Sequence, residues 1–344
     1  MDRRAFLLGS CAAMALSRRA HADDLDDLSA RLASETKICA ASATVLRNGH
    51  VVRQLSVSGC GTAPGPDAVF QAASLSKPVV AYIVLQMARR GKLSLDRPLS
   101  EIFPDGYAHR QNIFALKEAP VVDTVPVEVL RAVTPRALLS HSAGFPNWAS
   151  KGPLTPSFAP GARWQYSGEG YLLLQRMLEA VTERPLQQLA EQEVFAPIGL
   201  TDTAFKLTPA IQPNLVSGAP RQLRFPYEIA PSSLYTSAND YARFMAAVLG
   251  DEQLLALITT DPVKLPAPNL SWGLGWAIEE RGRPASIWHW GSNPGFRSLA
   301  MADLRSRDAV VVLTSSEAGM PLAKAILNSV LPGDHPGLDL DLVR

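Results

Sequence analysis

The pattern of apolar and polar positions predicts strands near both ends of the chain and helices between them. Residues 38–47 and 50–58 are rich in Ala, Val, Ser and Leu, and Asn48-Gly49 between them is typical of a tight hairpin turn. Strand-like segments return at residues 272–278, 297–304 and 309–314. This arrangement predicts an α+β fold in which both ends of the chain share one antiparallel sheet.

The middle of the chain is predicted to be mostly helical. Residues 72–90 carry apolar side chains at helical spacing and stop at Gly91, and Pro78 falls near the first turn, where a missing N–H is tolerated. Further helices are predicted at residues 136–141, 170–181, 186–194, 239–249 and 321–331. Residues 106–127 show little periodicity, so we expect a loop or an insertion there.

We therefore expect a single domain over residues 23–344, built from two parts. Residues 23–75 and 269–344 would form the sheet part, and residues 76–268 would form a mostly helical inserted subdomain. A ligand site is expected in the cleft between the two parts.

The first 22 residues resemble an export signal. Arg3 and Arg4 precede a small and apolar stretch, and Ala20-His21-Ala22 matches a cleavage site that would leave Asp23 as the first residue. The two arginines also resemble a twin-arginine signal, which predicts export to the bacterial periplasm. The alternatives are a basic amphipathic first helix and a lipoprotein site at Cys11, although the apolar stretch before Cys11 is short.

Composition and charge narrow the classes of partner. The chain has 344 residues and a formal net charge of +1, so no basic field predicts nucleic-acid binding. Its apolar runs are shorter than the ~18–20 residues that span a bilayer, so no stable membrane span is expected.

Two cysteines lie beyond the predicted signal, too few for a disulfide framework or a zinc cluster. A two-residue turn at Asn48-Gly49 would place Cys39 opposite Ser58, and Cys60 diagonally on the same face. A disulfide between the cysteines would need a bulge or a twist, so their pairing stays open.

Ser74 and Lys77 form an S-x-x-K motif near the start of a predicted helix. The spacing of three places the hydroxyl and the amine on one helical face, where a partly desolvated lysine can take the serine proton or tune another base. The motif alone is weak, because Ser34 and Lys37 match it as well and a surface serine explains any single match.

Further motifs follow Ser74 in a fixed order. They are Leu-Leu-x-His-x-x-Gly at residues 138–144, Pro-Gly-x-x-x-x-Tyr-Ser at residues 160–167 and His-x-Gly at residues 289–291, with additional landmarks at residues 197–203 and 272–276. This ordered set resembles the serine β-lactamase and penicillin-binding-protein superfamily, most closely the class C β-lactamases and the related esterases and D-amino-acid peptidases. The resemblance covers about residues 38–314.

The resemblance implies a serine hydrolase that works through an acyl-enzyme. Ser74 would be the nucleophile, activated by Lys77 and Tyr166, and the Lys77 cation would lower the pKa of the Tyr166 phenol. The backbone N–H groups of Ser74 and Ser292 would form the oxyanion hole. The plain alternative for Tyr166 is a core aromatic residue whose hydroxyl finds a backbone partner.

The same resemblance implies that His289, Trp290 and Gly291 form the strand that lines the substrate cleft opposite the nucleophile. His289 could contact Tyr166 or the substrate, and the plain alternative is a structural strand histidine. His141 is expected to pin a loop rather than to do chemistry.

Two positions depart from the family pattern. Gly168 replaces the asparagine of Tyr-x-Asn, so the amide that usually contacts the substrate or Lys77 is missing. His289 replaces the lysine of Lys-Thr-Gly, and a histidine with a pKa near ~6.5 is mostly neutral at pH 7, so it offers no permanent charge to a substrate carboxylate. We therefore expect an ester, amide or lactam substrate, with esters favoured and with a β-lactamase or D-alanyl carboxypeptidase as the alternative.

Other classes of function have less support. A non-catalytic binding or sensor module of the same fold and a degenerate structural paralogue are both disfavoured by the intact Ser74, Lys77 and Tyr166. The chain has no G-x-S-x-G elbow, P-loop or dinucleotide fingerprint, and its six histidines show no metal-binding spacing. We expect a small-molecule or peptide-like substrate and no cofactor or metal.

Overall fold

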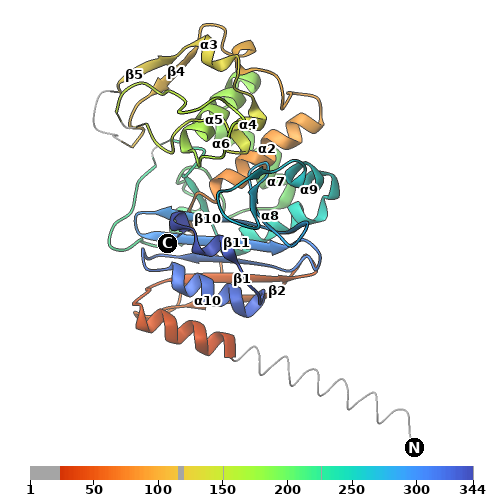
Figure 1. Ribbon diagram of the computed structural model, residues 1–344. Helices are drawn as coiled ribbons and strands as arrows, with labels where there is room; N and C mark the ends of the chain where they lie inside the picture. Colours follow the sequence, from red (N-terminus) through yellow and green to blue (C-terminus); the bar gives the residue numbers. More distant parts are fainter. Residues whose placement is uncertain (1–23, 115–119, 150, 226, 344) are drawn as a thin grey trace, which may run out of the picture.

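The computed structural model describes residues 24–114, 120–149, 151–225 and 227–343. They form an eight-stranded antiparallel sheet in which strands from both ends of the chain are neighbours, which confirms the predicted α+β fold. Figure 1 shows this sheet in the lower half of the molecule, with helices above and below it. The order across the sheet is β2 (His50–Val57), β1 (Ala41–Arg47), β12 (Ala309–Thr314), β11 (Phe296–Asp303), β10 (Pro284–Asn293), β9 (Ala277–Glu280), β8 (Leu270–Trp272) and β7 (Val263–Lys264).

The alternation of side chains along the strands gives the sheet two apolar faces. In β12, Val310 and Val312 belong to the apolar cluster that contains α10 (Met320–Val330) and the helix of residues 24–35. Val311 and Leu313 belong to the opposite cluster, with α2 (Ser76–Arg89) and α8 (Ala238–Gly250). Because helices cover both faces, β12 is buried along its whole length.

The helical part lies on the α2 side of the sheet, between β3 and β7 in sequence (Figure 1). Its other helices are α3 (Val127–Leu130), α4 (Pro135–Leu139), α5 (Gly168–Thr182), α6 (Leu186–Ala190), α7 (Ala196–Ile198) and α9 (Glu252–Thr259). A π-helical turn, Glu191–Phe195, joins α6 to α7, and 3-10 turns occupy Leu99–Glu101, Gln212–Asn214, Pro336–Asp339 and Asp341–Val343. Two small antiparallel sheets pair β3 (Phe70–Ala73) with β6 (Leu234–Thr236), and β4 (Tyr107–Arg110) with β5 (Val122–Val125).

Most predicted helices are confirmed. The helices α4, α5, α8 and α10 match the predictions at residues 136–141, 170–181, 239–249 and 321–331 to within two residues at each end. The predicted helix at residues 186–194 continues through the π-helical turn into α7.

Three segments differ from the predicted elements. Residues 106–127 hold the β4–β5 hairpin instead of a loop, and their periodicity is weak because the strands are short and β5 is mostly exposed. Residues 272–278 belong to two strands, β8 and β9, because the chain turns at Gly273-Leu274-Gly275. The predicted helix at residues 72–90 begins only at Ser76, because the preceding residues pair as β3 with β6.

The predicted hairpin turn at Asn48-Gly49 is confirmed, since φ is +50° at Asn48 and +76° at Gly49, as a type I′ turn requires. A one-residue bulge follows in β2. Val45 pairs with Arg53 and not with Val52, so the register of the rest of the hairpin shifts by one.

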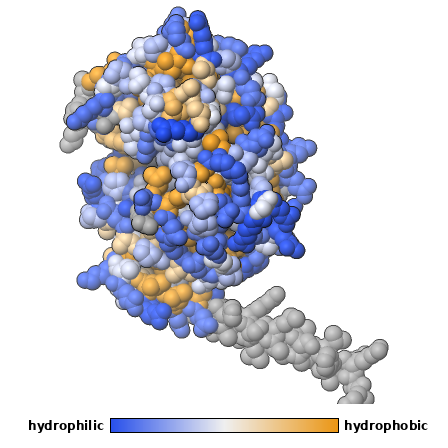
Figure 2. Space-filling model, in the orientation of Figure 1, coloured by the Kyte–Doolittle hydropathy of each residue, from blue (hydrophilic) through white to orange (hydrophobic). Residues whose placement is uncertain are grey.

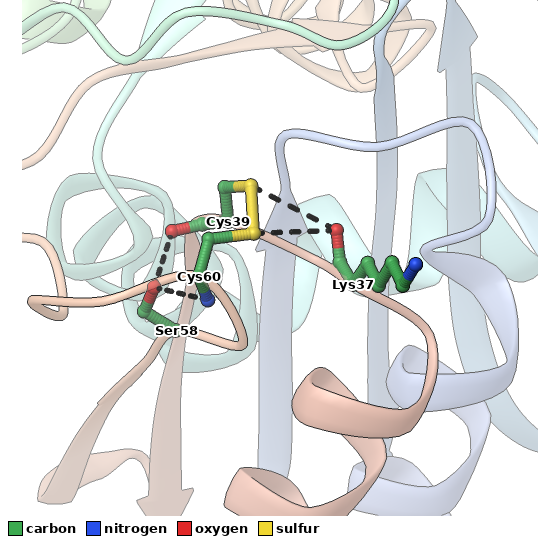
Figure 3. Close-up of a disulfide and its surroundings, with 4 residues drawn as sticks. All are labelled: Lys37, Cys39, Ser58 and Cys60. Atoms are coloured by element: carbon green, nitrogen blue, oxygen red, sulfur yellow. Dashed lines mark hydrogen bonds between the residues drawn. A yellow bond between two sulfur atoms is a disulfide. The ribbon is translucent and has the colours of Figure 1, made fainter.

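The two-residue turn alone leaves open whether Cys39 and Cys60 can pair, and the bulge allows them to do so. Cys39 and Cys60 are joined by a disulfide, with their Cα atoms 4.8 Å apart (Figure 3). Ser58 supports the bridge, because its Oγ donates to the Cys39 carbonyl at 2.8 Å and accepts from the Cys60 N–H at 3.2 Å. The disulfide ties the start of β1 to the segment after β2.

The predicted export signal, with Cys11, lies outside the described residues. In the part of the chain that the structure describes, no helix combines the length and apolar character needed to cross a membrane. The assignment of residues 23–344 to one domain stays a prediction. The face shown in Figure 2 is mostly polar, with apolar patches near the middle of the view.

Candidate active site

Ser74 lies at a sharp turn between β3 and α2. Ala73, the last residue of β3, has a φ of +52°, a left-handed conformation that alanine rarely adopts. A hydrogen bond from the Leu75 N–H to the Ala72 carbonyl, 3.1 Å long, closes the turn and leaves Ser74 half-buried. Such a backbone conformation costs about 1–3 kcal/mol, so neighbouring contacts must hold it.

Two other serine hydroxyls hold this turn. The Ser76 Oγ donates to the Ala73 carbonyl at 2.5 Å and accepts from the Leu234 N–H of β6 at 3.0 Å. The Ser298 Oγ of β11 donates to the Ala72 carbonyl at 2.8 Å. The turn is therefore fastened both to the small sheet and to the main sheet, by residues that the motifs did not single out.

Lys77 directs its amine at Ser74 from the first turn of α2. Its Nζ lies 3.0 Å from the Ser74 Oγ and donates to the Pro231 carbonyl at 2.9 Å. Lys77 is fully buried, and burial lowers the pKa of its amine well below the usual lysine value. In its neutral form, an amine that donates to Pro231 would keep its lone pair for the Ser74 proton.

Tyr166 lies beside the same amine, with the Lys77 Nζ 4.7 Å from the centroid of its ring. Burial raises the pKa of the Tyr166 phenol, and the nearby Ser74 hydroxyl opposes this shift only in part. Among the described residues the Oη has no hydrogen-bond partner of good geometry, so its contact with Ser74 is loose. The expectation that Lys77 lowers the phenol pKa is therefore wrong, because burial disfavours the ammonium and the phenolate alike.

Aromatic side chains fix the position of Tyr166. Trp290 stacks on its ring at a centroid distance of 5.2 Å, and the His141 ring lies 4.5 Å away. Trp272 meets Tyr166 edge-on at 5.7 Å and also contacts His289 at 5.4 Å. These rings belong to three separate stretches of the sequence, so the site depends on the packing of the sheet against the helical part.

His141 pins the segment that carries Tyr166, as predicted. Its Nδ1 accepts from the Ser167 N–H at 3.1 Å, and its carbonyl accepts from the Gln165 N–H at 2.8 Å. Burial lowers the pKa of His141 well below the usual histidine value, and the charges that Lys77 and His289 carry only when protonated act in the same direction. His141 is therefore neutral at physiological pH and acts as a hydrogen-bond acceptor here.

The strand β10 passes the Ser74 turn. Beyond Trp288 it pairs with β11 but, among the described strands, not with β9, so its other edge is open. A Cβ at Gly291 would lie 2.3 Å from the Ala72 carbonyl oxygen, so only glycine permits this approach of β10 to β3. The predicted oxyanion hole would use the backbone N–H of Ser292, the residue that follows Gly291 in β10.

His289 is buried, and its ring carries no charge. Its Nδ1 donates to the Trp290 carbonyl at 2.7 Å, which leaves the Nε2 as an acceptor with no partner among the described residues. Burial, and then the charge that Lys77 carries when protonated, lower the pKa of His289 to about 3. The position that a lysine occupies in the family pattern thus offers no positive charge at neutral pH.

Gly168, the other departure from the pattern, lies at the first turn of α5. Its N–H donates to the backbone and the side-chain oxygens of Asn147, at 3.0 Å each. A Cβ at Gly168 would lie 2.7 Å from the Asn147 carbonyl and 2.9 Å from the Trp148 indole. The space that an asparagine side chain would need is therefore filled by residues of another loop.

The sequence-predicted residues thus converge at one place, the junction of β3, α2, β10 and the start of α5. Within the described residues, no cluster of three or more His, Cys, Asp or Glu side chains has a metal-binding arrangement.

A sequence model of the family described as Beta-lactamase matches residues 23–330. The chain belongs to the beta-lactamase family. The family includes beta-lactamases, esterases and peptidases, so this member shares the fold of a group of serine hydrolases.

Individual members of the beta-lactamase family show how broad that group is. The chain is 24% identical over 297 residues to the D-alanyl-D-alanine-carboxypeptidase/endopeptidase AmpH of Escherichia coli strain K12, which covers 75% of this chain and 74% of AmpH. It is 26% identical over 250 residues to the esterase EstB of Burkholderia gladioli, which covers 62% of this chain and 57% of EstB. A class C beta-lactamase has a similar structure, with a TM-score of 0.72 and 17% identity over 92% of this chain and 98% of that one, a likeness in fold alone.

Proposed function

We propose that the chain is an exported serine hydrolase that forms an acyl-enzyme on Ser74, with uncharged esters as its favoured substrates. The observation that carries the proposal is the 3.0 Å approach of the buried Lys77 Nζ to the Ser74 Oγ. Because burial lowers the pKa of Lys77, the amine can act as a base at neutral pH without help from another group.

The reaction would begin when the Ser74 oxygen attacks the ester carbonyl and the Lys77 amine takes the hydroxyl proton. The backbone N–H groups of Ser74 and Ser292 would bind the oxyanion that develops. The bond to the alcohol oxygen then breaks, the leaving alkoxide takes a proton from the Tyr166 phenol, and the Lys77 ammonium returns a proton to the phenolate. Water cleaves the acyl-enzyme by the same proton transfers in reverse and releases the carboxylic acid.

The raised pKa of Tyr166 supports this division of roles. Burial disfavours both the Lys77 ammonium and the Tyr166 phenolate, and this favours a neutral amine beside a protonated phenol. Lys77 is then the base toward Ser74, and Tyr166 is the acid toward the leaving group. The aromatic packing around Tyr166 holds its Oη in place for that transfer.

The preference for an uncharged substrate rests on His289 and Gly168. A substrate carboxylate beside β10 would meet the neutral, buried His289 instead of a permanent cation. An amide side chain is missing at Gly168, where the loop of Asn147 fills the space. The similarity to EstB, named as an esterase, agrees with this preference.

A β-lactamase or D-alanyl carboxypeptidase is the second candidate, favoured by the similarity to AmpH over a larger share of the chain. Hydrolysis of p-nitrophenyl esters without turnover of nitrocefin or of a D-alanyl-D-alanine peptide would support the esterase. The reverse pattern would support the second candidate.

Export is part of the proposal. It is supported by the predicted signal at residues 1–22 and by the disulfide between Cys39 and Cys60, since disulfides persist in oxidising compartments. Expression in a bacterial host with a twin-arginine pathway should yield periplasmic protein whose first residue is Asp23. Intact cytoplasmic protein that begins at Met1 would contradict export.

The acyl-enzyme is tested by mass spectrometry after incubation with a fluorophosphonate. We expect one adduct on the wild type, none on Ser74→Ala, and full labelling of the matched variant Ser34→Ala. An equal adduct on Ser74→Ala would refute the proposed nucleophile.

Labelling without turnover separates an enzyme from a sensor of the same fold. Steady hydrolysis of any ester, amide or lactam, lost in Ser74→Ala, would establish the enzyme. A single burst of labelling with no turnover of any substrate in such a panel would favour the non-catalytic sensor.

A further inference from the structure

Trp148 lies beside the candidate site and fills space next to Gly168. Its indole lies against Gly168, two residues after Tyr166, and a Cβ at position 168 would be 2.9 Å from the nearest indole carbon. The indole is half-buried, so part of its surface faces solvent. An aromatic surface therefore stands where the family pattern has a hydrogen-bonding amide.

The loop that carries Trp148 is fastened to the first turn of α5 on both sides of the indole. The Asn147 carbonyl accepts from the Gly168 N–H at 3.0 Å and from the Glu169 N–H at 3.2 Å. The Ala149 N–H donates to the Glu169 Oε1 at 2.7 Å. These three hydrogen bonds fix the backbone of Trp148 relative to the helix that begins beside Tyr166.

A buried histidine in turn fixes Glu169. The Nε2 of His109 lies 3.1 Å from the Glu169 Oε2, and its Nδ1 lies 2.6 Å from the Asp123 Oδ1. The other carboxylate oxygen of Asp123 accepts from the Leu154 N–H at 2.7 Å, so the network holds the loop of Trp148 a second time. A loop held this firmly presents a preformed surface to a ligand.

Trp148 is also part of an apolar cluster that reaches the Ser74 side of the site. Phe114 meets the indole edge-on at a centroid distance of 4.8 Å, and Leu223 packs against the same cluster. The Leu223 carbonyl accepts from the Gln71 side chain at 2.7 Å, three residues before Ser74. The cluster is thus anchored beside Tyr166 at one end and beside the nucleophile strand at the other.

We propose that Trp148, backed by Phe114, is the specificity-determining residue of the site and forms an apolar surface for the acyl chain of an uncharged ester. The proposal rests on the proposed function, because it assigns the substrate class of that same site. A straight acyl chain of a few carbons would lie against the indole and gain the free energy of leaving water. Burial of one methylene group corresponds to about a fourfold gain in kcat/KM.

The test compares acyl chain lengths. For the wild type we expect kcat/KM to rise from p-nitrophenyl acetate to the butyrate, by about 15-fold for two methylene groups. In Trp148→Leu this rise should shrink to about threefold or less, because kcat/KM for the butyrate should fall more than kcat/KM for the acetate. The matched control is Phe103→Leu, another half-buried aromatic, which packs on Tyr107 in a different cluster and should keep the wild-type rise.

Gly168→Ala is a second variant that adds atoms instead of removing them. The new Cβ would lie 2.7 Å from the Asn147 carbonyl and 2.9 Å from the indole, so it should displace the loop together with Trp148. We therefore expect it to flatten the chain-length dependence in the same direction as Trp148→Leu. An unchanged butyrate-to-acetate ratio in both folded variants would overturn the role of Trp148 and leave the hydrolase intact.

Covalent labelling keeps the two proposals apart. Fluorophosphonates with ethyl and hexyl chains should label Ser74 of the wild type at rates that favour hexyl, and Trp148→Leu should lose that preference. Failure of every phosphonate to label Ser74 would overturn the hydrolase proposal and this one with it. Labelling without any chain-length preference in the wild type would overturn this one alone.

Discussion

The chain contains the pattern Ser-x-x-Lys twice, and the fold gives the two copies opposite surroundings. In both copies the lysine N–H donates to the serine carbonyl, at 3.2 Å for Lys37 and Ser34 and at 3.0 Å for Lys77 and Ser74. The backbones differ otherwise, because Lys37 follows the end of a helix with a φ of +53° and Lys77 lies in the first turn of α2. Ser34 and Lys37 are exposed at the end of the helix of residues 24–35, whereas Lys77 is fully buried. The comparison teaches that burial, and not the motif, distinguishes Lys77, the proposed catalytic base, from Lys37.

The two lysines also differ in what they face. The Lys77 amine is aimed at Ser74 and the Pro231 carbonyl, while Figure 3 shows the Lys37 side chain extending away from the Cys39–Cys60 disulfide. The carbonyl of Lys37 contacts the disulfide sulfur atoms. One copy thus supplies a candidate base, and the other forms part of a structural brace.

The largest difference is expected when each lysine is replaced by methionine. Lys77→Met removes the proposed base and should lower kcat/KM for an ester by about 10³-fold, within the range that general-base groups contribute. Lys37→Met should stay within twofold of the wild type. Equal losses of kcat/KM in the two variants would show that the burial of Lys77 does not contribute to catalysis.

The pH dependence of the reaction sharpens the same comparison. Lys77 is a base only when neutral, so log kcat/KM should rise with pH at a slope of one and then level off. Because burial lowers the pKa of Lys77, the break should lie well below the usual lysine pKa, and the raised pKa of Tyr166 should leave the plateau intact above it. A break at the ordinary lysine value, about 10.4, would contradict the role assigned to burial.

The same pKa shift makes a prediction for stability. A buried lysine whose folded-state pKa lies below its unfolded value destabilises the fold most at low pH, and this cost fades as pH rises between the two values. Lys77→Met should therefore raise the melting temperature by a few degrees at pH 6, and by less at pH 9. Lys37→Met, at the exposed site, serves as the control.

Substitution of the residue before each lysine is expected to change kcat/KM by a smaller factor. Ser76→Ala removes a hydroxyl that bridges the Ala73 carbonyl and the Leu234 N–H, so it should cost about 1–3 kcal/mol of unfolding free energy and about 10- to 50-fold in kcat/KM. Its counterpart Thr36 bonds only to the Leu32 carbonyl one turn back, and Thr36→Ala should cost about 0.5 kcal/mol with no loss of activity. Urea unfolding and ester kinetics on both variants measure the difference.

If Ser76→Ala lost stability but kept full kcat/KM, the predicted link between this hydroxyl and activity would be contradicted. This result would mean that the strained turn at Ala73 persists without the bridge, held by Ser298 and by the remaining hydrogen bonds of the turn. Replacement of Ser76 by threonine should then restore stability without a change in kinetics.

The sequence predicts the residues of the candidate site better than their protonation states. The order of the motifs selects Ser74 over Ser34, and the structure brings Tyr166 and His289 to the same place. The direction of the Tyr166 pKa shift is missed, because it depends on how deeply distant segments bury the phenol. Periodicity carries no information on such long-range packing.

Two features of the fold could likewise not be predicted from the sequence pattern. Asn48-Gly49 identifies the first hairpin, but nothing in its pattern reveals the bulge at Val52 that lets Cys39 meet Cys60. The proposed role of Trp148 cannot be read from the pattern either, because its contact with Gly168 joins a loop to the first turn of α5, about 20 residues further along the chain. Only a search for the side chain that fills the space of the missing asparagine could have suggested it.

The smallest effect on activity is expected at the disulfide beside Lys37. The paired variant Cys39→Ser and Cys60→Ser opens a loop with a sequence separation of 21 residues, which should cost about 3 kcal/mol of unfolding free energy. The ester kcat/KM should stay within twofold, because the bridge ties the start of β1 to the end of the β2 hairpin, and none of the hydrogen bonds that hold the Ser74 turn involves these segments.

The wild type treated with a reductant controls for the serine substitutions and should unfold at the same urea concentration as the paired variant. A tenfold loss of kcat/KM without the bridge would contradict the comparison, because it would show that the exposed copy of the motif affects the buried one. The coupling could then run through α8, which packs on β1 and whose Tyr241 Oη donates to the Leu75 carbonyl at 3.0 Å. It could also run through the main sheet, because β1 pairs with β12, β12 with β11, and Ser298 of β11 holds the Ala72 carbonyl. A route through the sheet would depend on Ser298. Ser298→Ala in the reduced protein should in that case cause no further loss.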